Sequence, residues 1–347
     1  MMEFREGKAV IRVPEFEKVT SKSTVFYNPA MKFDRALSVQ IFQASGKKKV
    51  LDAFSGSGIR AILYALEGAT VTANDRNPCA VRLIQENAAL NLVSLQILHE
   101  DANMVLRKEK FELIDIDPFG SPAPYLDSVM CGLGHDSWLF VTATDTEAVC
   151  GYAPRAALRK YGVHVVRTPF AKELGIRVLL TAIMREGAKY GLGFSVMLSY
   201  WRMHYLRVFV RTIWSKKAAV TTMKQVMPAY VCQCGYVSTR CTVCCPSCGE
   251  ALHILSPIYM GPIKDNEFLH TIPDHPLIQA VCSELDTPLY YNTHHLAKIH
   301  GFPPPKLTGL IKAIRDEGHS ASRTLFCSTG VKTDADFPAV LTLCQKT

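Results

Sequence analysis

The chain has 347 residues, of which 48% are hydrophobic and 20% charged, and its formal net charge is +8. This composition is typical of a soluble globular protein, and the length allows two or three domains. No apolar run approaches the length of a membrane span, which excludes a membrane-spanning protein. The first residues show no basic segment before an apolar core, so we expect no secretory signal and a cytoplasmic location.

From residue 49 the chain alternates short apolar, β-branched runs with helical stretches. A helix is expected over Ile59–Leu66, and another opens at Asn77-Pro78. The pattern predicts five strands, at residues 49–54, 70–75, 95–102, 111–117 and 137–145. Strands and helices that alternate in this way indicate a doubly wound α/β domain with a parallel sheet.

The second half of the chain contains longer elements. An amphipathic helix is expected over about 172–190, and two strand-like runs within 193–211 can add antiparallel strands to the sheet. Residues 215–228 have the composition of a linker. From about Asp265 we expect a separate, helix-led piece, which includes a helix that ends at Gly318.

A glycine turn, LDAFSGSGIR, lies between the first strand and its helix. Gly56 and Gly58 allow the backbone to bend sharply and to approach a ligand closely. Asp52 ends the first strand and Asp75 the second, where an acid can accept both hydroxyls of an adenosine ribose. The pattern fits an NAD enzyme or an S-adenosylmethionine enzyme, and it also fits a tight turn that only packs on the sheet.

Two details favour S-adenosylmethionine. The third glycine of a dinucleotide fingerprint is missing, because Arg60 and Ala61 occupy that region. An acid followed by a small residue, Asp101-Ala102, ends the third strand. We expect the adenine ring beside this pair, with the Asp101 carboxylate positioned for its exocyclic amine.

The fourth strand brings Asp117-Pro118-Phe119 to the carboxyl edge, where open α/β sheets bind ligands. The segment resembles the Asp/Asn-Pro-Pro-aromatic motif of methyltransferases that act on exocyclic amines of bases. Such an amine is a poor nucleophile, because its lone pair is delocalised into the ring. The Asp117 carboxylate and the Pro118 carbonyl can accept its N–H groups and pull the nitrogen towards a pyramidal geometry, while Phe119 stacks on the base.

A purely structural alternative exists for this segment. Asp117 would then cap the next helix, and Phe119 would be a core ring. Ser121, before Pro122, suits the cap position better, so we expect a catalytic role for the segment. Asp145 ends the fifth strand at the same edge and is a secondary candidate.

Six of the twelve cysteines crowd between residues 232 and 248, which indicates metal ligands rather than disulfides. A structural zinc needs four of them. A glycine follows Cys234 and Cys248 and permits a tight turn there. We therefore choose the set Cys232, Cys234, Cys245 and Cys248. The pair Cys241 and Cys244 has a better spacing for half of a zinc site than Cys232 and Cys234, but Cys244 directly precedes Cys245. The choice of four cysteines therefore stays open.

Basic residues concentrate in one stretch. Residues 153–217 hold thirteen Lys and Arg and two acids, a net charge of +11, so the rest of the chain sums to 8 − 11 = −3. This excess favours a polyanionic partner such as nucleic acid. Arg155 and Arg159 lie four apart on a short predicted helix and would meet phosphates together. A solvated basic face is the alternative.

The chain resembles a known family, the tRNA (guanine-26-N2)-dimethyltransferases, over nearly its whole length. The matching stretches are FREGKAVIRVP, VFYNPAMKFDRALSV, LDAFSGSGIRA, IDIDPFGSP, VTATDTEAVCGYAPRAALRKYG, TPLYYNTHHLAKIHG and SRTLFCSTGVKTDA. The combination of DPFGSP with VTATD is specific, whereas the glycine loop alone is not. The resemblance implies transfer of one or two methyl groups from S-adenosylmethionine to N2 of guanine 26 in tRNA.

The resemblance also implies roles for single residues. Asp117 and Phe119 carry over as catalytic residues, and Phe26 as a second aromatic side chain of the base pocket. The contacts to S-adenosylmethionine carry over to Arg35, Arg60, Asp75, Asp101 and Ala102. From the residues alone, Phe26 looks like a core ring and Arg35 like a surface charge.

We therefore expect an α/β fold with a Rossmann-like class I methyltransferase domain at 1–217. A linker and zinc-binding segment would follow at 218–261, and a smaller α+β C-terminal tRNA-binding domain at 262–347. The expected partner is tRNA, without a membrane or an obligate protein partner. Two other functions stay open: an adenine or cytosine N-methyltransferase acting on rRNA or DNA, and a non-catalytic zinc-containing RNA-binding protein.

Overall fold

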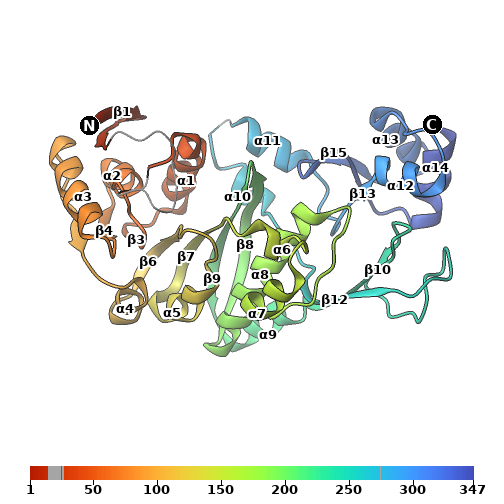
Figure 1. Cartoon of the computed structure of the whole chain (residues 1–347), viewed down its shortest axis with the longest axis horizontal. Coiled ribbons are helices and arrows are strands. Elements are labelled where there is room, and N and C mark those ends of the chain that lie inside the picture. The colour runs from red at the N-terminus through yellow and green to blue at the C-terminus, as the bar shows by residue number, and fades with distance from the viewer. Residues whose placement is uncertain (15–24, 26, 274) are drawn as a thin grey trace.

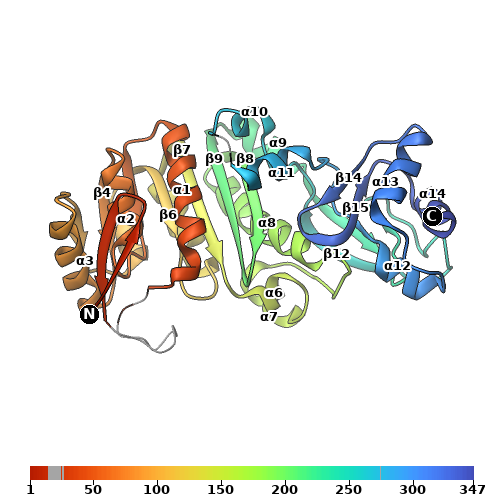
Figure 2. The same cartoon turned by 90° about the horizontal axis from the view of Figure 1, so that it is seen from above.

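The computed structural model describes residues 1–14, 25, 27–273 and 275–347. A seven-stranded sheet forms the centre of an elongated molecule, and a lobe built from the last part of the chain extends from one end (Figure 1). Figure 2 shows the same arrangement from above, with α3 at one end and the C-terminal lobe at the other. The expected α/β architecture is confirmed.

The large sheet has the strand order β5-β4-β3-β6-β7-β9-β8. Its first five strands in the chain, β3 to β7, pair in parallel, whereas β9 runs antiparallel to both β7 and β8. The antiparallel addition expected after residue 193 is therefore confirmed. The strands span Lys49–Asp52 (β3), Thr70–Asn74 (β4), Gln96–Leu98 (β5), Phe111–Ile116 (β6), Leu133–Ala143 (β7), Leu192–Arg202 (β8) and Tyr205–Trp214 (β9).

Helices cover both faces of this sheet, because alternate strand residues point to opposite sides. Val50 and Leu113 pack with α1, α2 and α3, whereas Leu51 and Ile114 pack with α4, α5 and α8. Two short helices, α6 and α7, follow β7 at the carboxyl edge. The helices span Lys32–Ser45 (α1), Ile59–Leu66 (α2), Pro78–Leu90 (α3), Ala102–Lys108 (α4), Leu126–Gly132 (α5), Thr146–Val149 (α6), Pro154–Tyr161 (α7) and Ala171–Lys189 (α8).

Two expected elements differ from the structure. The linker expected at 215–228 is wrong, because Lys216–Met223 forms a helix, α9, that packs on β8. The absence of a side chain at Gly193 allows this approach, since a Cβ there would lie 2.6 Å from the carbonyl carbon of Ala218. The third strand is shorter than expected, because Asp101 already caps α4 and ends the extended segment.

An N-terminal hairpin of β1 (Met2–Glu6) and β2 (Ala9–Val13) packs on α2 and α3. Two side chains of α3 hold its backbone: Asn87 accepts from Arg12 N and Asn91 from Val10 N, both at 2.8 Å. The hairpin is thereby attached to the helices on one face of the large sheet.

The lobe contains two three-stranded sheets, of order β11-β10-β12 and β13-β15-β14. Its helix α12 lies close to the cysteine segment. The strands span Val226–Val231 (β10), Val237–Ser238 (β11), His253–Tyr259 (β12), Tyr291–Asn292 (β13), Ala321–Thr324 (β14) and Cys327–Thr333 (β15). The helices span Asn266–Leu269 (α10), Pro276–Ser283 (α11), Thr293–His300 (α12), Leu307–Asp316 (α13) and Phe337–Lys346 (α14).

The boundary between the lobe and the rest is well packed. Leu269 and Ile278, just after the boundary proposed at 261/262, join the core around Trp138 on the large sheet. A cluster of buried charges lies nearby, which we call the junction cluster: Glu173, Arg177, Glu284 and Lys332. The proposed division into domains stays a prediction. Among the described helices, none combines the length and apolar character needed to cross a membrane.

Candidate active site and metal centre

A cavity of about 530 Å³ opens at the carboxyl edge of the parallel strands. It brings together seven of the residues predicted from sequence. Its lining also includes residues that the sequence did not indicate, such as Thr144 after β7 and His204 in the β8–β9 turn. The seven predicted residues in the lining are Gly56, Asp75, Asp101, Ala102, Asp117, Pro118 and Phe119.

The glycine turn and the acid after β4 hold each other in place. Asp75 accepts hydrogen bonds from Gly56 N at 2.8 Å and from Asn77 N at 2.9 Å. Gly58 has φ +82°, and a Cβ there would lie 3.3 Å from Ile84, so a glycine is required at this position. The Asp75 carboxylate keeps lone pairs for a ligand, because each oxygen can accept more than one hydrogen bond.

The Asp117-Pro118-Phe119 segment is fixed by the neighbouring strand end. Gly120 N donates to Thr144 Oγ1 at 2.8 Å, and Thr144 N donates to Gly120 O at 2.9 Å. The Phe119 side chain is 56% exposed, which contradicts the alternative that it is a core ring. Asp117 follows the buried Asp115 by two residues, so the two side chains leave the strand on the same face.

A short chain of hydrogen bonds attaches the loop after Asp117-Pro118-Phe119 to α7 and to the end of β7. Ser121 Oγ donates to Tyr161 OH at 2.8 Å, and Tyr161 OH donates to Asp145 at 2.7 Å. Lys160 also binds Asp145, at 3.0 Å. Asp145, the secondary candidate, thus supports the loop and is absent from the cavity lining.

Arg60 lies beneath the cavity, 5% exposed, and is absent from its lining. Its guanidinium donates to Asp117 at 2.5 Å, to Asp34 at 2.9 Å and to Ser38 at 3.2 Å. The contact to S-adenosylmethionine that the resemblance implies for Arg60 stays a prediction. The observed contacts attach it to the Asp117 carboxylate.

A buried polar network continues from Arg60 into the core. Arg207 binds Asp115 through two hydrogen bonds of 2.9 and 2.7 Å, and Tyr64 OH donates to the same carboxylate at 2.7 Å. Tyr200 OH donates to Asp34 at 2.5 Å. The motifs in the sequence did not predict this network, although an arginine inside the apolar run YLRVFV is a usable signal for a buried ion pair.

Asp52 and Arg35 are also buried and lie outside the cavity lining. Desolvation, together with the charge of Asp115, raises the pKa of the Asp52 carboxyl to about 7, and its Oδ2 has no hydrogen-bond partner in the described part of the chain. Arg35 forms a two-pronged ion pair with Glu6 of the N-terminal hairpin, at 2.8 and 2.5 Å. Phe26 lies outside the residues that the structure describes.

The charge of the cavity fits a cationic ligand that carries a ribose. Four acidic side chains line it, namely Asp75, Glu100, Asp101 and Asp117. Asp75 lies at the glycine turn, as a ribose-binding acid should. Asp101 accepts from Asn103 N at 2.8 Å as the cap of α4, next to Ala102. These residues fit S-adenosylmethionine, whose sulfonium is positively charged.

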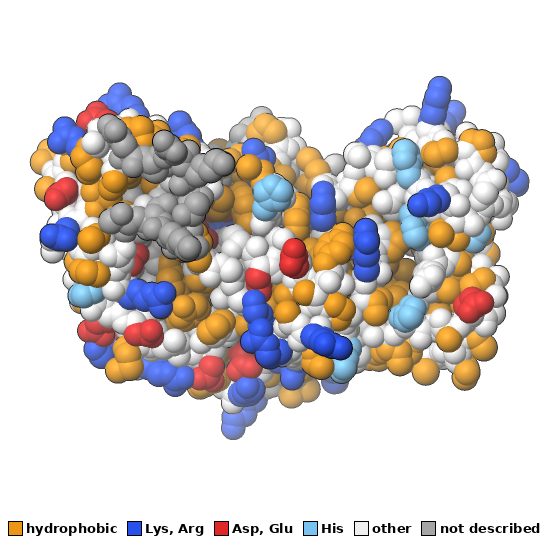
Figure 3. Space-filling model, viewed as in Figure 1, with side chains coloured by type: hydrophobic (Ala, Val, Ile, Leu, Met, Phe, Trp, Pro, Cys, Tyr) orange, Lys and Arg blue, Asp and Glu red, His pale blue; other side chains and the backbone are white. Residues whose placement is uncertain are grey.

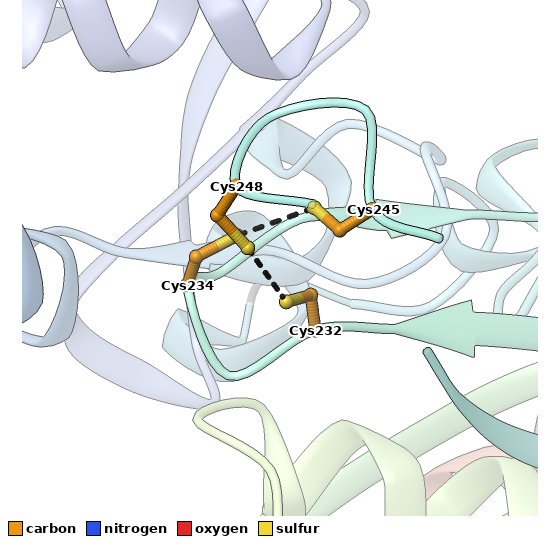
Figure 4. A group of neighbouring side chains, drawn as sticks. All are labelled: Cys232, Cys234, Cys245 and Cys248. Atoms are coloured by element: carbon orange, nitrogen blue, oxygen red, sulfur yellow. Dashed lines mark hydrogen bonds between the residues drawn. The ribbon is translucent and has the colours of Figure 1, made fainter. Parts of the chain in front are cut away.

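The structure brings the four chosen cysteines together at the tips of two turns (Figure 4). The Sγ atoms of Cys232, Cys234, Cys245 and Cys248 all lie within 4.8 Å of one another. The Cys232–Cys248 pair is 3.4 Å apart and the Cys234–Cys245 pair 3.6 Å. Zn–S bonds of about 2.3 Å in a tetrahedron place the sulfur atoms about 3.8 Å apart, so the arrangement is compatible with a structural zinc.

Two histidines of α12 form hydrogen bonds with the backbone of the cysteine turn. His300 binds the Cys234 carbonyl at 2.8 Å and His295 the Gln233 carbonyl at 3.1 Å. Both rings therefore attach the cysteine turn to α12. Cys241 and Cys244 are exposed and do not belong to the cluster.

Comparison with known proteins places this geometry in a family. The family described as N2,N2-dimethylguanosine tRNA methyltransferase matches residues 7–345. A tRNA (guanine(26)-N(2))-dimethyltransferase of Thermococcus kodakarensis is 37% identical, over 97% of this chain and 96% of the relative. One of Archaeoglobus fulgidus is 36% identical, over 98% and 97%. The structure of Trm1 from Pyrococcus horikoshii with S-adenosyl-L-methionine superposes with a TM-score of 0.89 at 32% identity, over 99% of this chain and 100% of that one.

Proposed function

This chain belongs to the N2,N2-dimethylguanosine tRNA methyltransferase family, and we propose that it methylates N2 of guanine 26 in tRNA. S-adenosylmethionine supplies the methyl group when bound, carried on its positively charged sulfur. The observation that carries this proposal is the cavity itself. It joins an acid-lined cofactor end at Asp75 and Asp101 to the Asp117-Pro118-Phe119 segment.

The protein's own groups prepare the guanine amine for attack. The Asp117 carboxylate and the Pro118 carbonyl accept its N–H groups, and the exposed Phe119 ring stacks on the base. Arg60 holds one Asp117 oxygen, Oδ2, at 2.5 Å. In the described part of the chain the other oxygen, Oδ1, accepts no hydrogen bond, so it suits the amine and the proton that the amine loses after transfer. Fixing these groups in advance supplies much of the rate in such a reaction.

The same groups limit the second methyl transfer. After one transfer the amine keeps a single N–H, so Asp117 and the Pro118 carbonyl cannot both accept from it. We propose that both methyl groups are added and that the second step depends more on the shape of the pocket. A time course of nucleoside masses in tRNA tests this, because monomethylguanosine should rise first and then fall. If monomethylguanosine is the end product under excess enzyme and cofactor, the proposal for the second step is wrong.

The Asp117→Ala variant tests the catalytic assignment. We expect methyl transfer to fall at least about 100-fold, a typical loss for a group that moves a proton, with little change in the Kd for S-adenosylmethionine. Asp127→Ala is a matched control, because Asp127 is an acid outside the cavity whose side chain is 48% exposed. Near-normal turnover of the Asp117 variant would contradict the assignment.

The four-cysteine centre and the exposed basic residues complete the proposal. We propose that Cys232, Cys234, Cys245 and Cys248 hold a structural zinc that shapes the lobe. The basic excess of residues 153–217 is partly internal, because Arg177 and Arg207 are buried and ion-paired. Arg155 and Arg159 on α7 are exposed, and we propose that they contact tRNA phosphates.

A further inference from the structure

A second cavity, of about 580 Å³, lies between the segment after β7 and the lobe. One wall comes from Tyr152 and residues 166–170, which flank α7. The opposite wall comes from the cysteine turn at Gln233 and from Leu296 and Ile299 of α12. Segments far apart in the sequence therefore form it together.

The charge of this cavity is opposite to that of the catalytic one. Four acids line the catalytic cavity, whereas none of the described side chains that line the second cavity is acidic. Arg167, His253 and His295 line it instead. On the face shown in Figure 3, Lys and Arg side chains lie across the middle with a few acidic ones among them, and several histidines lie on the C-terminal lobe. Such a site favours a ligand with negative charge.

The chemistry of its wall suits a nucleotide. The Arg167 guanidinium lies 5.2 Å from the centre of the Tyr152 ring, and that ring is 54% exposed. An exposed tyrosine ring of this kind can stack on an unpaired base while the neighbouring arginine meets a phosphate.

One polar side chain in the lining can read the edge of a base. Gln233 is exposed, and its side-chain amide offers both a donor and an acceptor. The lining can therefore stack on a small ligand, neutralise its negative charge and form hydrogen bonds with it.

We propose that this cavity binds a second unpaired nucleotide of the tRNA, apart from the guanine that is methylated. The inference rests on the proposed function for its substrate. Thr144 lines the catalytic cavity and Tyr152 the second one, and the chain between them spans at most about 28 Å when extended. One folded RNA can thus reach both cavities. A nucleotide bound in the second cavity would determine which guanine of the tRNA enters the catalytic cavity.

Steady-state kinetics of two variants, Tyr152→Ala and Arg167→Gln, test the proposal. We expect the KM for tRNA to rise about 10-fold, as the loss of one stacked base implies. The kcat at saturating tRNA and the Kd for S-adenosylmethionine should stay within about 2-fold, because neither residue lines the catalytic cavity. Lys217→Ala is the matched control, since it removes an exposed charge on α9 that lines neither cavity.

Ultraviolet cross-linking of the wild-type enzyme to tRNA identifies the ligand directly. We expect the peptide that contains Tyr152 to carry a nucleotide other than guanine 26. A cross-link to guanine 26 at Tyr152, or an unchanged KM for tRNA in both variants, would overturn the second site. Failure of the wild-type enzyme to methylate guanine 26 would instead overturn the proposed function, so the two failures are distinguishable.

Discussion

The Arg60 guanidinium donates to the Asp117 carboxylate at 2.5 Å and, through the same nitrogen, to the buried Asp34 at 2.9 Å. One side chain thereby connects Asp117, the proposed catalytic acid, whose side chain is 21% exposed, to a carboxylate that is fully buried. The position of the Asp117 carboxylate thus depends on the interior of the protein. We propose that Arg60 positions Asp117 in this arrangement.

The Arg60→Lys variant separates positioning from cofactor binding. Lysine keeps the charge but cannot donate to Asp34, Ser38 and Asp117 with the planar geometry of arginine. We expect kcat to fall at least about 10-fold while the Kd for S-adenosylmethionine changes less than about 2-fold. Arg82→Lys on the exposed face of α3 is the control. If the Kd rises and kcat stays normal, Arg60 is instead the cofactor contact that the resemblance implies.

Reversing the charges of α7 tests where tRNA phosphates bind. The double variant Arg155→Glu, Arg159→Glu should weaken tRNA binding and lower the slope of log Kd against log salt by about one to two. The double variant Lys216→Glu, Lys217→Glu makes the same change of charge on α9 and should have little effect. The salt dependence of filter binding measures both. An unchanged slope for the α7 variant would place the RNA elsewhere.

Single cysteine variants identify the ligands of the zinc centre. Native mass spectrometry should find one zinc ion per wild-type chain and none after Cys245→Ser, because three sulfur ligands hold the ion far more weakly. Cys241→Ser and Cys244→Ser should keep the metal, since both residues lie outside the cluster. Loss of zinc from either control with retention in Cys245→Ser would show that the chosen set of four is wrong.

Stability should depend on pH through Asp52. The pKa of this carboxyl is raised to about 7 in the folded protein, against about 4 in an unfolded chain. Between these values the unfolded chain releases the proton and the folded chain keeps it, so the free energy of unfolding falls as the pH rises towards 7. Asp52→Asn removes this effect, on the order of 1–4 kcal/mol.

Urea unfolding at about pH 5.5 and pH 8.5 measures this effect. The stability of Asp52→Asn relative to wild type should increase from the lower to the higher pH. Asp127→Asn is the control, because a hydrogen bond from Tyr190 lowers the pKa of Asp127 and it stays ionised across this range. An equal difference at both pH values would mean that Asp52 is ionised in the folded state throughout.

The sequence was most informative where a motif implies one backbone shape. The glycine turn and the Asp-Pro-Phe segment end strands, and parallel strands bring their ends to one edge, so Asp75 and Asp117 had to lie close together. Arg60 was different, because its contact with Asp34 joins two helices that face each other only after folding. The cysteines illustrate both situations. The sequence shows that six cysteines are clustered, but only the folded structure shows that Cys245 belongs to the four-cysteine group and that Cys241 and Cys244 do not.

The junction cluster has a consequence for how the chain folds and how it can be dissected. Lys332 of the lobe lies 3.3 Å from Glu173 and 3.0 Å from Glu284, and all three side chains are buried. Removing one partner of a buried ion pair typically costs about 3–5 kcal/mol, a large part of the stability of a whole domain. A shortened chain without the lobe would leave Glu173 facing water beside uncovered apolar surface. The two parts therefore should denature in one cooperative transition, and neither serves as an independent module.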